Sequence, residues 1–238
     1  MPNLLQFPRY LYEKGQVQIF SDFTEDFDAV EWVATLTDLG TASVGDAARG
    51  LLALVPSDGT VADNDEAYLE SPNEVFLLAA GKPLLFEARI QFTEANVDDV
   101  NILAGIMSAV GADTLVDNGG GPQATFDGAV IYKVDGGTVW RCMSSRGTTR
   151  TDSVSTTTAG GTTPQTLRIE WHDYSTTQSQ VTYFVNDIQL VDANNVSIKH
   201  LVNLASATEM QVAFGIKNGG ITVVETLNID YVYAGQLR

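Results

Sequence analysis

The feature that most constrains the fold is a strict two-residue alternation between Leu84 and Phe92. Every second position from Leu84 is apolar, and the intervening positions include Glu87, Arg89 and Gln91. Successive side chains of a strand point to opposite faces, so this pattern predicts a β-strand with one buried face. Similar segments recur along the chain between turns rich in Gly, Asn and Asp. Helix is expected only as a short turn around residues 44–49.

Two hairpins are expected from their turn residues. The apolar runs Gly128–Val134 and Thr138–Met143 flank Asp135-Gly136-Gly137, a sequence typical of a tight turn between antiparallel strands. The segment Gln180–Val191 has apolar residues at every second position up to a second turn, at Asn186-Asp187. These patterns predict antiparallel sheets with one buried face.

Three segments near the end of the chain carry a family resemblance. Residues 166–171 (TLRIEW), 181–190 (VTYFVNDIQL) and 227–233 (LNIDYVY) follow one another in the order found in the concanavalin A-like lectin/glucanase superfamily, and the opening Asp22–Trp32 also resembles the start of such domains. The resemblance implies an all-β fold, an antiparallel β-sandwich of jelly-roll type. That superfamily includes lectins, glycan-cleaving enzymes and structural modules of virus particles, so the fold does not settle the function.

Residues 1–15 differ in composition from the rest of the chain and predict an extended N-terminal arm. Large apolar residues crowd into nine positions, while Pro2 and Pro8 interrupt any helix or central strand. A free apolar strip is sticky, so we expect the arm either to pack on its own domain or to dock on another subunit. The residues expected to bind a partner are Leu4, Leu5, Phe7, Tyr10 and Tyr12. Residues 16–238 contain no evident linker or repeat and predict a single β-sandwich domain.

The cysteine content and the N-terminal sequence indicate the compartment. Cys142 is the single cysteine, so no internal disulfide can form, and its apolar neighbours predict a buried or half-buried strand position. The N-terminus lacks the basic segment, apolar core and cleavage site of a signal peptide, which predicts synthesis in a cytoplasm. No apolar run approaches the ~18 residues of a membrane span.

The formal net charge is −17, and it is concentrated in the first half of the chain. Between Asp22 and Asp117 there are 19 acidic residues against 3 basic ones, a net of −16, whereas residues 118–238 have 10 against 8, a net of −2. An acidic surface repels phosphate backbones, which argues against nucleic acid as a ligand. It favours solubility, a basic partner surface or cations.

The carboxylates do not form a pattern of glycan-cleaving enzymes. Such enzymes need paired acids that project into one groove, yet no Glu-x-Asp-x-Glu strand occurs. Glu170 and Asp173 are three residues apart, so in a strand they would face opposite ways, and Asp230 stands alone. Glu87-Ala-Arg89 faintly resembles a strand of the lyase relatives, whose Gln-x-His motif is absent. These observations predict that the protein is not an enzyme.

Other candidate sites are sparse. His172 and His200 are the only histidines, and neither has an acid at metal-ligand spacing, so both are expected to be ordinary surface or strand-end residues. The three tryptophans lie in apolar patterns and are expected in the core rather than over a sugar. The loop with Asp58, Asp63 and Asp65 is a weak calcium candidate, and a second is formed by Glu94, Asp98 and Asp99.

Three classes of function compete on this basis. The resemblance, the acidic character, the single cysteine and the apolar arm predict a structural virion protein, a bacteriophage capsid decoration (cement) protein made in the host cytoplasm and located on the capsid surface. Its partners would be the major capsid protein or other virion proteins, and it would form a homo-oligomer. The alternatives are a lectin-like carbohydrate-binding module or a phage fibre or spike domain. A glycan-cleaving enzyme ranks last.

Overall fold

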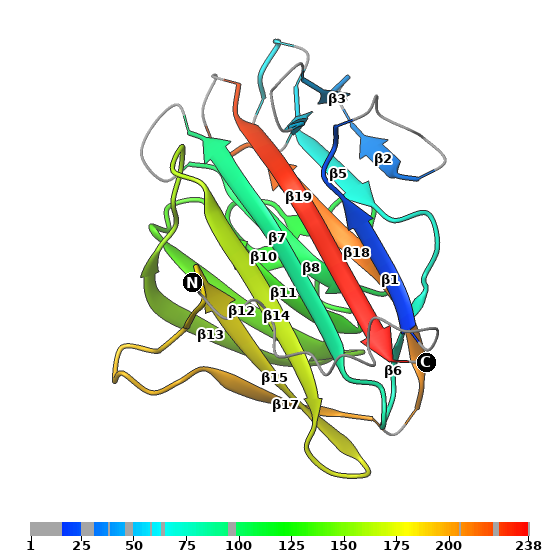
Figure 1. The fold of residues 1–238 in the computed structure, drawn as a ribbon. Coiled ribbons are helices and arrows are strands. Elements are labelled where there is room, and N and C mark those ends of the chain that lie inside the picture. Colours follow the sequence, from blue (N-terminus) through cyan, green and yellow to red (C-terminus); the bar gives the residue numbers. More distant parts are fainter. Residues whose placement is uncertain are drawn as a thin grey trace.

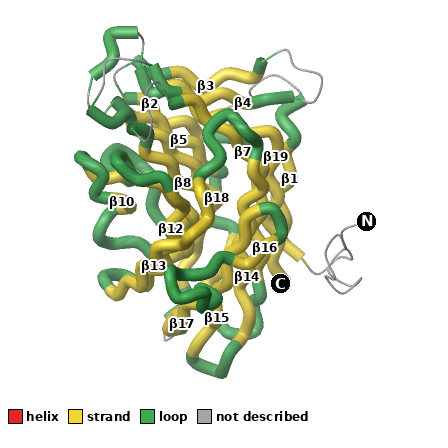
Figure 2. Tube along the Cα trace, turned by 90° about the vertical axis from the view of Figure 1, so that its left-hand side faces the viewer, coloured by secondary structure: helices red, strands yellow, loops and turns green. Residues whose placement is uncertain are grey.

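The computed structural model describes residues 16–24, 31–37, 39–45, 50–57, 59–62, 65–94, 99–204, 206–220 and 224–237. These residues form two antiparallel sheets packed face to face, seen from the front in Figure 1 and from the side in Figure 2. No helix occurs among them, so none is long and apolar enough to span a membrane. The predicted all-β sandwich is therefore confirmed.

The front layer, sheet A, is built around two long central strands, β7 and β19. Its strands are β1 (Gln16–Ser21), β3 (Thr41–Val44), β4 (Leu52–Val55), β7 (Leu84–Thr93), β14 (Gln165–Asp173), β15 (Gln178–Val185), β16 (Ile188–Gln189), β17 (Lys199–Asn203) and β19 (Thr226–Leu237). They lie in the order β16-β15-β14-β7-β19-β4-β3, with β17 also paired to β15 and β1 to β19.

The rear layer, sheet B, has the order β13-β12-β11-β8-β18-β5-β2, with β6 also paired to β18. Its strands are β2 (Val33–Leu36), β5 (Glu66–Glu70), β6 (Phe76–Leu78), β8 (Asn101–Met107), β11 (Gly128–Lys133), β12 (Val139–Arg146), β13 (Thr149–Thr158) and β18 (Thr208–Lys217). A separate pair, β9 (Leu115–Val116) and β10 (Gly121–Pro122), lies in the long loop between β8 and β11.

The core between the sheets follows the predicted alternation. In β7 the even-numbered side chains are buried, and Glu87, Arg89 and Gln91 on the other face are only half-buried. Phe86 packs on Phe214 of β18 with ring centroids 5.9 Å apart. Burial of each such side chain contributes about 1.5–3 kcal/mol, so β7 is a principal source of stability.

The predicted tight turns are present. Asn186 and Asp187 have φ of 50° and 65°, the left-handed geometry that a two-residue hairpin turn requires, and they join β15 to β16. Gly136 has φ of 72° in the turn between β11 and β12. The segment that begins at Asn218 is not a hairpin turn of this kind. It connects two sheets, because β18 belongs to sheet B and the next described strand, β19, belongs to sheet A.

Several short or polar strands were not predicted correctly. A strand, β3, occupies residues 41–44, where the sequence suggested only the approach to a helical turn; residues 46–49 of that turn lie outside the described part. By contrast, the Thr- and Ser-rich stretch after residue 148, whose composition allows either a long excursion or an edge strand, does form an edge strand, β13. Strand β17 was missed, because its alternating residues include Lys199, His200 and Asn203.

Strand β19 contains a bulge between Ile229 and Tyr231, opposite β7. Before the bulge Leu227 and Ile229 are buried, and after it Val232 and Ala234 are buried, so the parity of the inward positions changes. On the edge of β19 that faces away from β7, the paired strand also changes at the bulge. The first part of β19 pairs with β4 and the second part pairs with β1.

Candidate functional site

The outer face of sheet B is covered by the loop of residues 109–127, which we call the strap. The strap includes β9 and β10, and its Leu115 and Phe126 are buried against the sheet. Beneath it, the outward side chains of sheet B form a second apolar cluster, separate from the main core. Its sheet residues are Tyr68, Leu103, Met107, Val130, Tyr132, Met143 and Ala213.

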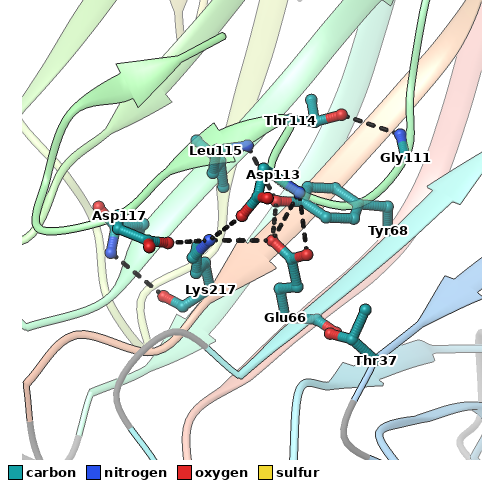
Figure 3. A network of polar contacts seen from close by, with 10 residues as sticks. Thr37, Glu66, Tyr68, Gly111, Asp113, Thr114, Leu115, Asp117 and Lys217 are labelled. Atoms are coloured by element: carbon teal, nitrogen blue, oxygen red, sulfur yellow. Dashed lines mark hydrogen bonds and ion pairs between the residues drawn. The ribbon is translucent and has the colours of Figure 1, made fainter.

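A buried ammonium group fastens the strap to the sheet (Figure 3). The Lys217 side chain is 1% exposed, and its Nζ lies 3.1 Å from Glu66 Oε2 and 3.1 Å from Asp113 Oδ1, with a further ion pair to Asp117. Burial opposes the charge on Lys217, but hydrogen bonds to these carboxylates outweigh it and raise its pKa. The strap is thus tied at two acidic positions to one cation of β18.

A tyrosine completes this network. Tyr68 donates its hydroxyl to Glu66 Oε2 at 2.7 Å and accepts the Leu115 amide at 2.9 Å. The Asp113 amide also donates to Glu66, at 2.9 and 3.1 Å to its two oxygens. Backbone groups of the strap, which would otherwise need water, are therefore bonded to side chains of β5.

Apart from the carboxylates bound to Lys217, the described part of the covered face does not bring two acids to a common groove. The outward residues of the central strand β11 include Val130 and Tyr132, both part of the apolar cluster. Tyr132 donates to Asp152 Oδ1 at 2.7 Å, and Asp152 is also paired with Arg141. Asp152 is therefore a partner of a tyrosine and an arginine, not one of two acids facing a common groove.

Beside the strap, one edge of the sandwich stays open between strands of the two sheets. Here β12, β13, β17 and the start of β15 enclose a groove of about 550 Å³. Its lining is mostly hydroxyl and amide side chains, with two apolar residues: Val202, which is buried, and Leu201, which is 45% exposed. The lining residues are Ser144, Ser145, Arg146, Gly147, Thr149, Thr151, Gln178, Leu201, Val202, Asn203 and Ser206. We call this the polar groove.

Arg146 is held rigidly at one wall of the polar groove. Its Nη1 donates to Thr208 Oγ1 at 2.6 Å, its Nη2 donates to the Ser206 carbonyl at 2.7 Å, and it pairs with Asp127. Desolvation opposes the charge of Asp127, but hydrogen bonds from Arg146, the Gly147 amide and Thr208 together outweigh it and lower the pKa of Asp127. Because Asp127 already neutralises the charge of Arg146, the guanidinium can form part of the groove wall without an anionic ligand.

His200 lies behind the polar groove and was missed as a structural residue. It is 2% exposed, with Nδ1 3.0 Å from both Ser144 Oγ and Tyr183 OH, and Nε2 3.0 Å from Ser153 Oγ. Burial lowers its pKa to about 4, so the ring is neutral at neutral pH. The sequence signal was available, since His200 shares the inward face of β17 with Val202.

His172 lies elsewhere, at the exposed end of β14. Its Nε2 is 3.1 Å from Glu170 Oε2. The two histidines therefore do not form a pair. Among the described residues, no three His, Cys, Asp or Glu side chains are arranged as metal ligands.

The outer face of sheet A carries the acids that the sequence analysis singled out. Glu87 and Glu170 both pair with Arg168, at 3.7 and 2.9 Å, and Asp230 pairs with Arg89. Desolvation opposes the charge of Glu170, yet its basic neighbours outweigh this and lower its pKa. Each acid has a basic partner in its own or an adjacent strand, so these residues form an ion-pair row and not an acid and base facing a substrate.

The calcium and arm candidates are only partly described. Asp58, Asp63 and Asp98 lie outside the described residues, as do Leu4, Leu5, Phe7, Tyr10 and Tyr12. Asp65 is buried, and its Oδ2 accepts the Ala62 amide at 2.8 Å. The tryptophans, as expected, belong to the core: Trp32, Trp140 and Trp171 are 3%, 0% and 2% exposed.

One buried acid was not anticipated. Glu225, just before β19, is 0% exposed. Burial, reinforced by the charge of Glu94, raises its pKa to about 8 despite the opposing effect of Lys133. Nothing in the local sequence distinguishes it from the solvent-exposed acids.

The fold places the chain beside proteins that bind or cleave glycans. An endo-1,3-beta-glucanase from Streptomyces sioyaensis is 16% identical, with a TM-score of 0.59 over 94% of this chain and 98% of that one. The potassium-bound carbohydrate recognition domain of Emp46p is 12% identical, with a TM-score of 0.60 over 90% and 94%. An endo-beta-1,4-glucuronan lyase from the fungus Trichoderma reesei is 12% identical, with a TM-score of 0.58 over 91% and 94%.

At these identities the likeness defines the fold alone. The chain has the concanavalin A-like lectin/glucanase jelly-roll fold, as the resemblance of its last strands implied. No protein-family model matches the sequence, and no curated protein matches it.

Proposed function

We propose that this protein is a non-catalytic carbohydrate-binding protein and that the polar groove is its sugar site. The observation that carries the proposal is the chemistry of the groove. Hydroxyl and amide groups such as those of Thr151, Gln178 and Asn203 can pair with sugar hydroxyls, and Leu201 offers an apolar contact for the C–H face of a ring. None of the groove residues in the described part of the chain carries a carboxylate.

The absence of acids in the groove lining favours binding over cleavage. Glycoside hydrolysis requires two carboxyl groups about 5–9.5 Å apart across the scissile bond. The acids on the opposite outer face, Glu87, Glu170 and Asp230, are paired with arginines. Proteins of this fold include both lectins and glycan-cleaving enzymes, so the proposal is supported by the groove chemistry and not by the fold.

The proposal is tested by titrating the full chain with soluble β-1,3-glucan, glucuronan and mannan oligosaccharides in a calorimeter. We expect at least one to bind without release of new reducing ends or unsaturated products. Asn203→Ala should weaken binding about fivefold to tenfold, the loss of one good hydrogen bond. Asn194→Ala, in an exposed turn outside the groove, is the matched control. Failure of all three glycans to bind, or turnover lost in Glu170→Gln, would overturn the proposal.

A second candidate is the structural virion protein, with the capsid surface as its location and the major capsid protein as its partner. The observation that favours it is the exposed position of β1, the strand that directly follows residues 1–15 in the sequence. They lead into β1, which pairs only with β19 among the described strands and borders a groove of about 340 Å³ lined in part by Trp32 and Val75. Phe20 of β1 is 63% exposed beside this groove.

This second candidate is tested with a chain that starts at Gln16. If the arm attaches the protein to particles or to other copies, the shortened chain should fold but lose particle binding or its oligomeric state. Attachment through Leu4, Phe7, Tyr10 and Tyr12 should persist at ~1 M sodium chloride, because apolar burial is not screened by salt. Release of most of the full-length protein at that salt concentration would contradict an arm-driven attachment.

A further inference from the structure

Asp127, the last residue of the strap, controls the charge at the wall of the polar groove. Its Oδ1 accepts the Gly147 amide at 2.6 Å, and its Oδ2 pairs with Arg146. Its own amide donates to Ser108 Oγ at 2.9 Å, and its carbonyl accepts the Ser108 amide, also at 2.9 Å. The carboxylate is therefore fixed between the strap and the end of β12.

The guanidinium of Arg146 keeps no pair of donors for a ligand. Its Nη1 bonds to Thr208 Oγ1 and pairs with Asp127, and its Nη2 donates to both the carbonyl and the hydroxyl of Ser206. These contacts use both hydrogens on each terminal nitrogen and leave only the Nε–H. Arginine recognises a carboxylate through two parallel donors, and Arg146 cannot offer them while these contacts persist.

The rest of the groove lining is uncharged. Every lining residue other than Arg146 has a hydroxyl, amide or apolar side chain or is glycine. Arg150 alternates with two lining residues of β13, so it points to the opposite face, where its Nη1 lies 3.5 Å from the Pro122 carbonyl of the strap. Lys199 begins β17 and is not part of the lining. The groove thus presents neutral donors and acceptors around one neutralised ion pair.

We propose, on the basis of the sugar site proposed above, that the polar groove selects uncharged glycans over glycans that carry carboxylates, and that Asp127 sets this selectivity. A sugar hydroxyl that enters the groove exchanges hydrogen bonds with water for equivalent neutral ones. A sugar carboxylate loses the hydration of a full charge and finds no unneutralised cation in return. The formal net charge of −17 further disfavours an acidic glycan.

The experiment compares matched ligands that differ only in charge. Oligosaccharides of β-1,3-glucan, β-1,4-glucan and mannan are titrated into the full chain, each in its uncharged form and after oxidation of its primary hydroxyl groups to carboxylates. For every backbone that binds, we expect the uncharged form to bind the wild type about tenfold more tightly or better, the difference expected for one unpaired charge.

Asp127→Asn should shift this preference. The variant keeps an oxygen for the Gly147 amide but leaves Arg146 without its counter-charge. The affinity for the oxidised form, relative to the uncharged form, should therefore rise about tenfold, because a charge-assisted hydrogen bond becomes available. Asp187→Asn is the matched control. It also removes one negative charge, from a turn at the opposite end of β15 to Gln178, where the Asp187 side chain is 61% exposed, and it should leave the preference unchanged.

The outcomes separate this selectivity from sugar binding itself. Equal or tighter binding of the oxidised forms by the wild type would overturn the selectivity and leave the sugar site standing. A folded Asp127→Asn protein with the wild-type preference would overturn the role of Asp127. Should that variant fail to fold, Thr151→Lys adds an ammonium to the lining at an exposed position of β13 and should produce the same gain. Binding of no glycan in either form would overturn the proposed function, and the selectivity with it.

Discussion

On each outer face of the sandwich one basic residue contacts three carboxylates, but the two charge clusters have different structural roles. On sheet A, Arg168 contacts three carboxylates, those of Glu87, Glu170 and Asp187. On sheet B, Lys217 also contacts three, those of Glu66, Asp113 and Asp117. The Arg168 side chain is 14% exposed and that of Lys217 only 1%.

The difference lies in what each cation connects. The partners of Arg168 lie on its own strand, the adjacent β7 and a nearby turn, which hydrogen bonds between strands already hold together. Lys217 connects β18 to the strap, and below the strap lies an apolar cluster that would otherwise face solvent. Burial and connectivity, rather than the number of ion pairs, therefore determine what a charge cluster contributes.

Replacing each cation gives the largest expected difference. Lys217→Met should lower the free energy of unfolding by about 3–5 kcal/mol, because it leaves buried Glu66 without its ionic partner. Arg168→Met should cost only about 1 kcal/mol, since its partners can be solvated. Urea denaturation of both variants measures this. Equal losses would show that the strap is no more dependent on its cation than the open face is.

The two histidines, both on strands of sheet A, test through pH how burial changes what a polar side chain contributes. The folded-state pKa of buried His200 is about 4, below the ordinary 6.5, so the unfolded chain takes up this proton first as pH falls. Stability present above pH 6.5 should be lost progressively toward pH 4, by about 3 kcal/mol. His200→Gln should flatten this part of the profile, whereas exposed His172→Gln should not. A profile unchanged by His200→Gln would contradict the assignment.

Two tyrosines give the smallest and most closely matched comparison. Tyr68 donates to Glu66 at 2.7 Å on sheet B, and Tyr231 donates to Glu87 at 2.8 Å on sheet A. Tyr68→Phe should cost about 1–3 kcal/mol because the buried Leu115 amide also loses its acceptor. Tyr231→Phe should cost less than ~1 kcal/mol, because water can reach Glu87. Thermal unfolding of the two variants in parallel measures both losses. A larger loss for Tyr231→Phe than for Tyr68→Phe would contradict the comparison.

The fold could be predicted where one residue pattern carried the information locally. Leu84–Phe92 alternates over nine residues, and Asn186-Asp187 supplies the left-handed turn of its hairpin. Strand β3 was missed because its alternation, Thr-Ala-Ser-Val, extends over only four residues. Strand β17 was missed because a polar histidine occupies an inward position.

The site depends on contacts that a linear pattern does not contain. Lys217 and Glu66 are 151 residues apart, and their pairing follows from the register of β18 on β5. The acids of the strap, Asp113 and Asp117, could not be assigned a partner from the sequence. Glu225 looked like any surface acid, because its burial results from the packing of strand ends that are distant in the sequence.

The bulge in β19 has a consequence for how this chain can vary in length. Asp230 is the extra residue of the bulge, because Ile229 pairs with Ile90 and Tyr231 pairs with the next residue of β7, Arg89. Deleting Asp230 would therefore leave a regular strand with Val232 and Ala234 still facing inward, whereas deleting a residue elsewhere in β19 would turn the side chains on one side of the deletion to the other face. Within β19, a one-residue change of length should therefore be tolerated best at Asp230.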